Sequence, residues 1–369
     1  MGRYFRDQAQ VIRAIVILPN RVRIVFRCLC LCAVALVLVS CETISYYGQA
    51  AKGQASLLWA RQSIDSLLKD TALDTETREK LELVLRVRDF ALQQLQLDAG
   101  NSYLSYVELN RPYVLWNVFA APEFSTQALN WCYPIAGCVS YRGYFSEAAS
   151  IDFAQTLEQQ SFDVYRGGVD AYSTLGWFND PLNSAILRRS DQRLVALIFH
   201  ELAHQKVYVA GDTSFNESFA TFVEQEGLRR WYAAQQQEGI EQALATQAQI
   251  EAAFVALVLK YRDRLTTLYA QTMSDEHKRV EKTAVQSAMR EEYARFRDQW
   301  NYTGYDRWFE GPLNNAQLAT VASYNELVPT FAKLLDREQG DLSRFYKAVQ
   351  ELAAMPYEAR TELLSQAAL

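Results

Sequence analysis

His200 and His204 lie four residues apart in the stretch FHELAHQ, and Glu201 directly follows the first of them. The chain has three histidines in 369 residues, so this spacing is improbable by chance. On an α-helix, residues i and i+4 project from one face, which lets two imidazoles bind one zinc ion. Glu201 would project about 100° away and could take a proton from zinc-activated water as general base. The stretch therefore predicts a catalytic zinc site.

The alternative interpretation of FHELAHQ is a buried core helix without a metal. Leu194, Ile198 and Leu202 make the surroundings apolar, as in the central helix of a domain. Its histidines would then be satisfied by local hydrogen bonds. Two histidines and a glutamate on a buried helix are costly without such a function, so we favour the zinc site.

A catalytic zinc ion needs a third protein ligand. Gly211 is placed to end the first helix, and a second helix starting near Ser214 would return antiparallel to it, with Glu217 beside the histidines. Residues 214–217 also match an S-x-x-E capping box, in which the glutamate satisfies a backbone N–H. Glu224 and His277 are rival ligands. We favour Glu217, because the capping interpretation leaves the zinc short of a ligand.

The elements that position these residues follow a helix-dominated α+β pattern. Apolar residues recur at helical spacing before residue 100 and again from residue 188 onward. Between residues 102 and 145, Tyr, Val, Trp and Phe alternate with Pro and Gly, which predicts short strands and turns. No Gly/Ser-rich or Pro-rich linker divides the chain, so residues 54–369 are expected to form one domain whose small sheet precedes the zinc helix.

The N-terminus has the pattern of an export signal. Three arginines precede a twelve-residue apolar run at 28–39, which is short for a membrane span and typical of a secretory signal. The run ends in LVSC, which resembles the bacterial lipobox and implies cleavage before Cys41 and lipidation of its thiol. We expect a signal peptide over 1–40 and a tether over 41–53, with the protein anchored in the outer membrane and facing the periplasm. The alternative is a short N-terminal membrane anchor.

Cysteine usage and net charge agree with an exported protein. Three of the six cysteines fall within the signal and Cys41 takes the lipid, which leaves Cys132 and Cys138. An even pair in an exported protein predicts a disulfide, whereas two zinc ligands with C-x5-C spacing and no second pair are disfavoured. The net charge of −6 argues against a nucleic-acid-binding protein. The sequence leaves the oligomeric state open.

Several stretches resemble known zinc peptidases. HELAHQ followed by NESFA resembles the gluzincin arrangement of two histidines and a glutamate on the next helix. WCYPIAGCVSYRGYF, GGVDAYSTLGWFNDPL, HELAHQKVYVAGDTSFNESFATFVEQEG and LNNAQLATVASYNELVPTF resemble a family of bacterial lipoproteins described as aminopeptidases, over most of residues 41–350. The resemblance implies a zincin-like fold and a peptidase with His200, His204 and Glu217 as zinc ligands and Glu201 as base.

The residues alone indicate metal-assisted hydrolysis, and aminopeptidase activity comes from the resemblance. Two other functions stay open: an envelope lipoprotein with a structural or binding role, and a zinc hydrolase of a non-peptide envelope substrate. Thermolysin-like enzymes carry an aspartate four residues after the ligand glutamate, which orients a zinc histidine. Thr221 stands there in this chain, so Asn216 becomes a candidate for that role.

A zinc peptidase also aligns its peptide substrate on an edge strand. Residues 171–178 are expected to form that strand, because they are the last strand-like stretch before the zinc helix. Ala171, Tyr172 and Ser173 would then contact the peptide. Asp170, directly before them, is a candidate for binding the free amine of an aminopeptidase substrate.

The oxyanion of the reaction needs a hydrogen-bond donor, usually a tyrosine or histidine. Tyr324, in the stretch ASYNEL, is our first candidate, followed by Tyr141 and Tyr144. With 21 tyrosines in the chain, the alternative for each is a packed aromatic side chain.

Overall fold

The computed structural model describes residues 43–133, 137–175, 177–235 and 240–367. The expected signal peptide and Cys41 lie outside these residues. The chain divides into two compact units, Met1–Ala55 and Ser56–Leu369. Residues 43–59 are helical, so the expected tether is a helix over its described part. The remaining description concerns the second unit.

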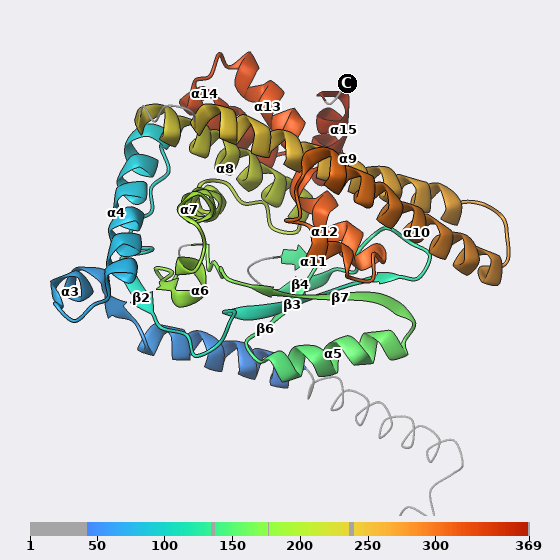
Figure 1. Cartoon of the computed structure of the whole chain (residues 1–369), viewed down its shortest axis with the longest axis horizontal. Coiled ribbons are helices and arrows are strands. Elements are labelled where there is room, and N and C mark those ends of the chain that lie inside the picture. The colour runs from blue at the N-terminus through green and yellow to red at the C-terminus, as the bar shows by residue number, and fades with distance from the viewer. Residues whose placement is uncertain (1–42, 134–136, 176, 236–239, 368–369) are drawn as a thin grey trace, which may run out of the picture. The chain divides into compact units, whose positions relative to one another are not determined.

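The second unit is built mainly from helices (Figure 1). Several begin at a Ser, Asp or Asn whose side chain accepts a hydrogen bond from a backbone N–H of the first turn, as at Asp74, Ser190 and Asn314. The helices are α3 (Ile64–Lys69), α4 (Thr75–Leu95), α5 (Glu147–Gln159), α6 (Ser184–Leu187), α7 (Asp191–Lys206), α8 (Thr213–Gln235), α9 (Ile240–Tyr269), α10 (Asp275–Trp300), α11 (Asp306–Phe309), α12 (Asn315–Asn325), α13 (Val328–Arg337), α14 (Leu342–Ala353) and α15 (Tyr357–Ala367).

The described strands form two small sheets and a hairpin, and all of them lie before α6. The first sheet has the order β1 (Gln62–Ser63), β2 (Ser105–Val107), β8 (Leu182–Asn183), and the second has the order β6 (Arg142–Tyr144), β3 (Leu115–Pro122), β7 (Phe162–Val169). The hairpin pairs β4 (Trp131–Tyr133) with β5 (Gly137–Val139). The helix-dominated α+β class with small sheets before α7 is therefore confirmed.

The prediction of an edge strand at residues 171–178 is wrong. Its described residues form a loop, because the buried carboxylate of Asp180 accepts hydrogen bonds from the backbone N–H of Thr174 and from the hydroxyls of Ser173 and Thr174. Leu175 has a φ of 55°, which no regular strand contains. Strand β7 is one of the two edge strands of the β6–β3–β7 sheet and pairs with β3 alone among the described strands.

Three apolar cores lie within the described part of this unit, and the two larger ones are formed mainly by helices. The main core joins α4, α7, α8, α13 and α14, and within it Leu194, Phe199 and Leu202 of α7 are almost completely buried. The second core joins α9, α10, α11 and α12. Helix α9 is long and apolar enough over Gln242–Tyr269 to cross a membrane, but Phe254 and Val258 pack in this second core. In Figure 1, α8 and α9 lie above α7, and the sheet of β6, β3 and β7 lies below it.

The predicted disulfide between Cys132 and Cys138 is confirmed. It closes the β4–β5 hairpin, and Gly137 lies against the turn between α7 and α8. A methyl group added at Gly137 would come within 2.5 Å of the backbone nitrogen of Gly211. The hairpin therefore supports the turn that sets the relation between the two helices of the candidate metal centre.

Candidate metal centre

The turn after α7 sets where α8 begins and therefore where Glu217 points. Gly211 has a φ of 89°, a left-handed backbone conformation that turns the chain between α7 and α8. Asp212 then caps α8, because its Oδ1 accepts a hydrogen bond from Phe215 N at 3.0 Å. Ser214 consequently lies inside the helix. The capping box is not formed, and Glu217 is free to face α7.

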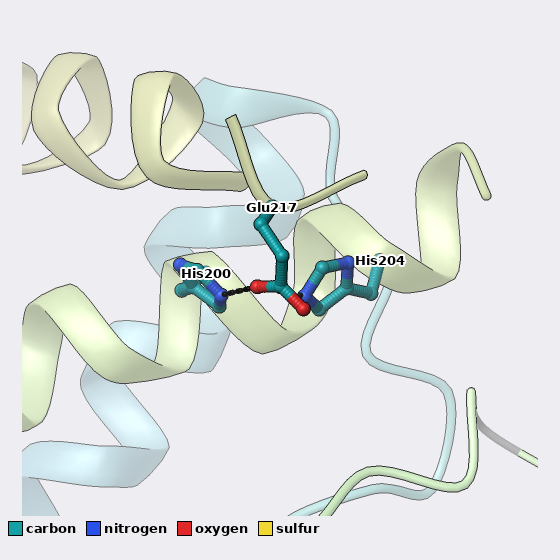
Figure 2. Close-up of side chains that lie close together, drawn as sticks. All are labelled: His200, His204 and Glu217. Atoms are coloured by element: carbon teal, nitrogen blue, oxygen red, sulfur yellow. Dashed lines mark ion pairs between the residues drawn. The ribbon is translucent and has the colours of Figure 1, made fainter. Parts of the chain in front are cut away.

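The side chains of His200, His204 and Glu217 converge (Figure 2). Glu217 Oε2 lies 3.3 Å from His200 Nε2 and 3.6 Å from His204 Nε2, and one ligand atom from each residue lies within 4.8 Å of the other two. All three residues are buried. Tetrahedral zinc with ligands at about 2.0–2.1 Å keeps them about 3.4 Å apart. The three donors could therefore hold a metal ion.

Hydrogen bonding within the group also fits a metal. Glu217 Oε2 is buried and has no hydrogen-bond partner among the described residues, although it faces two imidazole nitrogens. A buried carboxylate oxygen without a partner is costly. Two imidazole nitrogens and one carboxylate oxygen form a donor set typical of catalytic zinc, so a divalent cation would satisfy the oxygen.

The electrostatics of the group favour a cation. Burial opposes protonation of His200, but the close carboxylates of Glu217 and Glu224 raise its pKa to about 10. Burial likewise opposes ionisation of Glu217, but the charge of His204 and the close approach of both imidazoles lower its pKa below the usual value. The carboxylates therefore stabilise positive charge between the helices, which a bound metal ion could supply.

Comparison with known proteins adds one finding. A family model described as "Putative aminopeptidase" matches residues 45–364. The chain belongs to this family. The match agrees with the resemblance seen in the sequence and supports a peptidase-like role. No curated protein and no solved structure matched the chain.

In this member of the family, Glu201 projects from α7 beside the two histidines without joining the group of converging donors. Burial raises the pKa of its carboxyl above the usual value, and the charges of Glu217 and Asp180 act in the same direction. A raised pKa brings a carboxylate closer to the range of an efficient general base. The role of Glu201 as general base stays a prediction.

Glu224 orients His200. Its Oε2 lies 3.0 Å from His200 Nδ1, on the opposite side of the ring from Glu217. A proton on Nδ1 that is donated to Glu224 leaves the Nε2 lone pair free for a metal. Of the rival ligands, Glu224 therefore lies behind the histidine, and His277 is exposed on α10, with its nearest carboxylate oxygen on Glu281 at 3.8 Å.

The expectation that Asn216 orients a zinc histidine is wrong. Its side-chain amide instead bonds the backbone N–H and C=O of Val209, both at 2.8 Å, and so fixes the turn between the helices. Glu224 has the orienting position instead, two helical turns after Glu217 rather than one. The seven-residue spacing was the sequence signal for this role, because residues i and i+7 share a helix face.

We expect Glu224→Ala to weaken zinc binding by about 10- to 100-fold, the usual effect of losing a carboxylate behind a zinc histidine. Glu224→Gln should have a smaller effect, because its amide oxygen can still accept from His200 Nδ1. Competition with a chromophoric zinc chelator measures both. Gln225→Ala, at the exposed neighbouring position on α8, is the matched control. An unchanged zinc affinity in Glu224→Ala would contradict the orienting role.

The structure brings Tyr324 to the group. Its ring stacks on His200 at a centroid distance of 6.0 Å and an interplanar angle of 19°. Burial of the hydroxyl and the nearby charges of Glu217 and Glu201 raise the pKa of Tyr324 well above its usual value, so it stays protonated. The residue as a whole is 37% exposed, which places it at the rim with its hydroxyl directed inward.

The other two tyrosine candidates have different surroundings. Tyr141 lies close enough to Tyr324 to affect its pKa, whereas Tyr144 is buried and packs on Phe153. Tyr208, which the sequence analysis missed, meets the His204 ring edge-on at 6.4 Å. Nothing in the sequence distinguished it, because it lies in the irregular turn after α7.

The residues expected to contact substrate, 170–173, each make other contacts within the protein. Asp170 forms an ion pair with Arg189 Nε at 3.0 Å, so its charge is already matched. Ala171 packs against the main core, and Tyr172 meets Phe145 edge-on. The Ser173 hydroxyl is directed to Asp180.

Proposed function

We propose that this protein is a zinc-dependent peptidase, and that it acts as an aminopeptidase. One observation carries the proposal: an unsatisfied, buried Glu217 oxygen faces the Nε2 atoms of two histidines, with Glu201 on the same helix turn. A structural zinc site has no use for that fourth residue, whereas a hydrolytic site needs a base. The aminopeptidase assignment is supported by the family to which the chain belongs.

Each residue of the site then has a role. His200, His204 and Glu217 would hold zinc, which supplies Lewis-acid activation of a carbonyl group and of water. Glu201 takes the proton of the attacking water and delivers it to the leaving amine. The Tyr324 hydroxyl donates a hydrogen bond to the oxygen of the scissile carbonyl as negative charge develops there. Glu224 holds His200 in the tautomer that presents Nε2.

We also propose that the peptidase is exported and anchored by lipid on Cys41 in the outer membrane, where it would meet peptides of the periplasm. The lipobox-like LVSC stretch and the cysteine pair that forms a disulfide support this location. A disulfide persists in an oxidising compartment, and the cytoplasm would reduce it.

The test uses the purified protein from residue 43 onward. We expect about one zinc ion per chain by atomic absorption, and release of amino acids from peptides with a free N-terminus. A chelator should remove both zinc and activity, and added zinc should restore activity. Hydrolysis that persists in the zinc-free protein would contradict the metal mechanism, and zinc binding without hydrolysis across a broad peptide library would contradict the peptidase assignment.

A further inference from the structure

The hydroxyl group of Ser218 joins α8 to the segment that carries Tyr324. It donates a hydrogen bond to the backbone oxygen of Ser323 at 3.3 Å and accepts one from the backbone N–H of Leu327 at 3.2 Å. Ser218 is completely buried and directly follows Glu217 on α8. Two neighbours in the chain therefore contact the candidate metal centre and the segment of Tyr324, respectively.

The two hydrogen bonds of Ser218 lie where the helical pattern of α12 stops. In a continuous α-helix, the N–H of Leu327 would donate to the C=O of Ser323. The preceding pair follows this rule, because Glu326 N donates to Ala322 O at 3.0 Å. Leu327 N and Ser323 O bond the Ser218 hydroxyl instead. A side chain inserted into this pattern kinks a helix, so we expect the Ser218 hydroxyl to hold the break between α12 and α13.

Tyr324 lies at this break. It follows Ser323 directly and precedes Leu327 by three residues, and α12 ends at Asn325. Its ring stacks on His200, yet the residue as a whole is exposed at the rim of the centre. Helix ends fray, so a side chain there is held less firmly than one in the middle of a helix. The hydrogen bonds on either side of Tyr324 therefore limit its movement relative to His200.

Helix α8 provides a fixed reference for both sides of the site. Phe215 and Phe219 of α8 contact Phe331 of α13 at ring-centroid distances of 5.4 and 5.6 Å, and all three rings are completely buried. Glu217 and Ser218 are about 100° apart around the helix axis. Glu217 consequently points to the two histidines (Figure 2), while Ser218 points to the break between α12 and α13.

We propose that Ser218 is a positioning residue of the peptidase, whose hydroxyl fixes the place of the Tyr324 hydroxyl relative to the metal. The assignment rests on the proposed function and deepens it, because it names the residue that holds the oxyanion donor. Such a donor is effective only where it meets the oxygen on which charge develops, and a misplacement of about 1 Å can lower a rate about 10²-fold. Since Ser218 is buried, it acts through Tyr324 rather than on the substrate.

A double-mutant cycle tests whether Ser218 acts through Tyr324. For a free-amine peptide, Tyr324→Phe should lower kcat about 10²- to 10³-fold, the usual cost of a lost oxyanion donor. Ser218→Ala should lower kcat about 10- to 100-fold, and both variants should keep the KM and zinc content of the wild type. In the Tyr324→Phe background, Ser218→Ala should lower kcat no further, because residues that act as a unit are not additive.

Ser323→Ala is the matched control. Its hydroxyl donates to the carbonyl of Ala319 within α12 at 3.0 Å, and its loss leaves both hydrogen bonds of Ser218 in place. This variant should therefore have the wild-type kcat. Should Ser218→Ala not fold, Ser218→Cys replaces it in the cycle, because a thiol has a similar size and is a weaker hydrogen-bond donor.

A binding measurement gives a second readout. A phosphinic peptide resembles the tetrahedral intermediate in shape and charge. It should bind the zinc-loaded Ser218→Ala variant about 10- to 100-fold more weakly than the wild type, because an analogue of the transition state loses affinity as kcat/KM falls. Ser323→Ala should bind it as the wild type does.

Three outcomes would overturn the positioning role with the peptidase proposal intact. They are a wild-type kcat in Ser218→Ala, a wild-type kcat in Tyr324→Phe, and losses that add in the double variant. The second leaves no donor for Ser218 to position, and the third means that Ser218 acts independently of Tyr324. If the wild type neither hydrolyses the peptide nor binds the phosphinic peptide, the peptidase proposal itself fails and the positioning role fails with it.

Discussion

Glu201→Gln should lower kcat/KM for peptide hydrolysis by about 10²- to 10⁴-fold, the usual contribution of a positioned general base. The glutamine side chain has the same size and remains on α7 beside His200, so the fold and the three converging donors are unaffected. Removal of the carboxylate also removes the group that returns a proton to the leaving amine. Zinc content should therefore stay at the wild-type level while turnover is lost.

Initial rates on a free-amine peptide and zinc content by atomic absorption check this result together. Glu158→Gln, an exposed position on α5, is the matched control and should leave both quantities unchanged. A Glu201→Gln variant that keeps its zinc and hydrolyses peptides at the wild-type rate would disprove the assignment of Glu201 as base.

Arg360→Met should destabilise the protein by about 3–5 kcal/mol, because it leaves a buried carboxylate without its partner. Arg360 Nη2 lies 2.7 Å from Asp212 Oδ2, and the side chains of Arg360 and Asp212 are 3% and 10% exposed. Asp212 also caps α8, which carries Glu217 and Glu224. The loss should therefore appear in the denaturant midpoint and also as weaker zinc binding.

A double variant tests this explanation. Asp212→Asn combined with Arg360→Met removes both charges and keeps an N-cap oxygen for Phe215 N. We expect the double variant to regain most of the stability lost in Arg360→Met, because an uncharged pair carries no uncompensated charge. Equal destabilisation in the two variants would show that packing of the arginine, including its position over the Phe215 ring, outweighs the charge.

Helix α7 with its two histidines was predictable because its information is local. The spacing of His200 and His204 fixes their common face through helix geometry, and the buried side chains of α7 recur at the expected period. Glu217 followed from a short connection between two helices. The capping-box alternative could not be excluded from sequence, because it depended on whether α8 begins before or after Ser214. Asp212 decided this by capping the helix two residues earlier.

The substrate side of the site could not be predicted in the same way. The stretch before Asp180 has strand-forming residues. The buried carboxylate of Asp180, however, accepts hydrogen bonds from the backbone N–H and the hydroxyl of Thr174, and these bonds hold the stretch as a loop. Tyr324 was one of 21 tyrosines, and its position over His200 depends on the packing of α12 against α8. His200 and Tyr324 are over a hundred positions apart in the chain, and no periodic pattern in the sequence predicts a contact at that separation.

The sequence by itself determined the helix-dominated α+β class, the disulfide pair and the shared face of His200 and His204, since each rests on short-range spacing or on residue counts. Only the tertiary structure decided that Glu217 joins the two histidines, that Glu224 stands behind His200, and that β7, rather than residues 171–178, lies at a sheet edge. These depend on which faces of distant helices and strands meet when the apolar cores close, and burial then fixes which charges have partners.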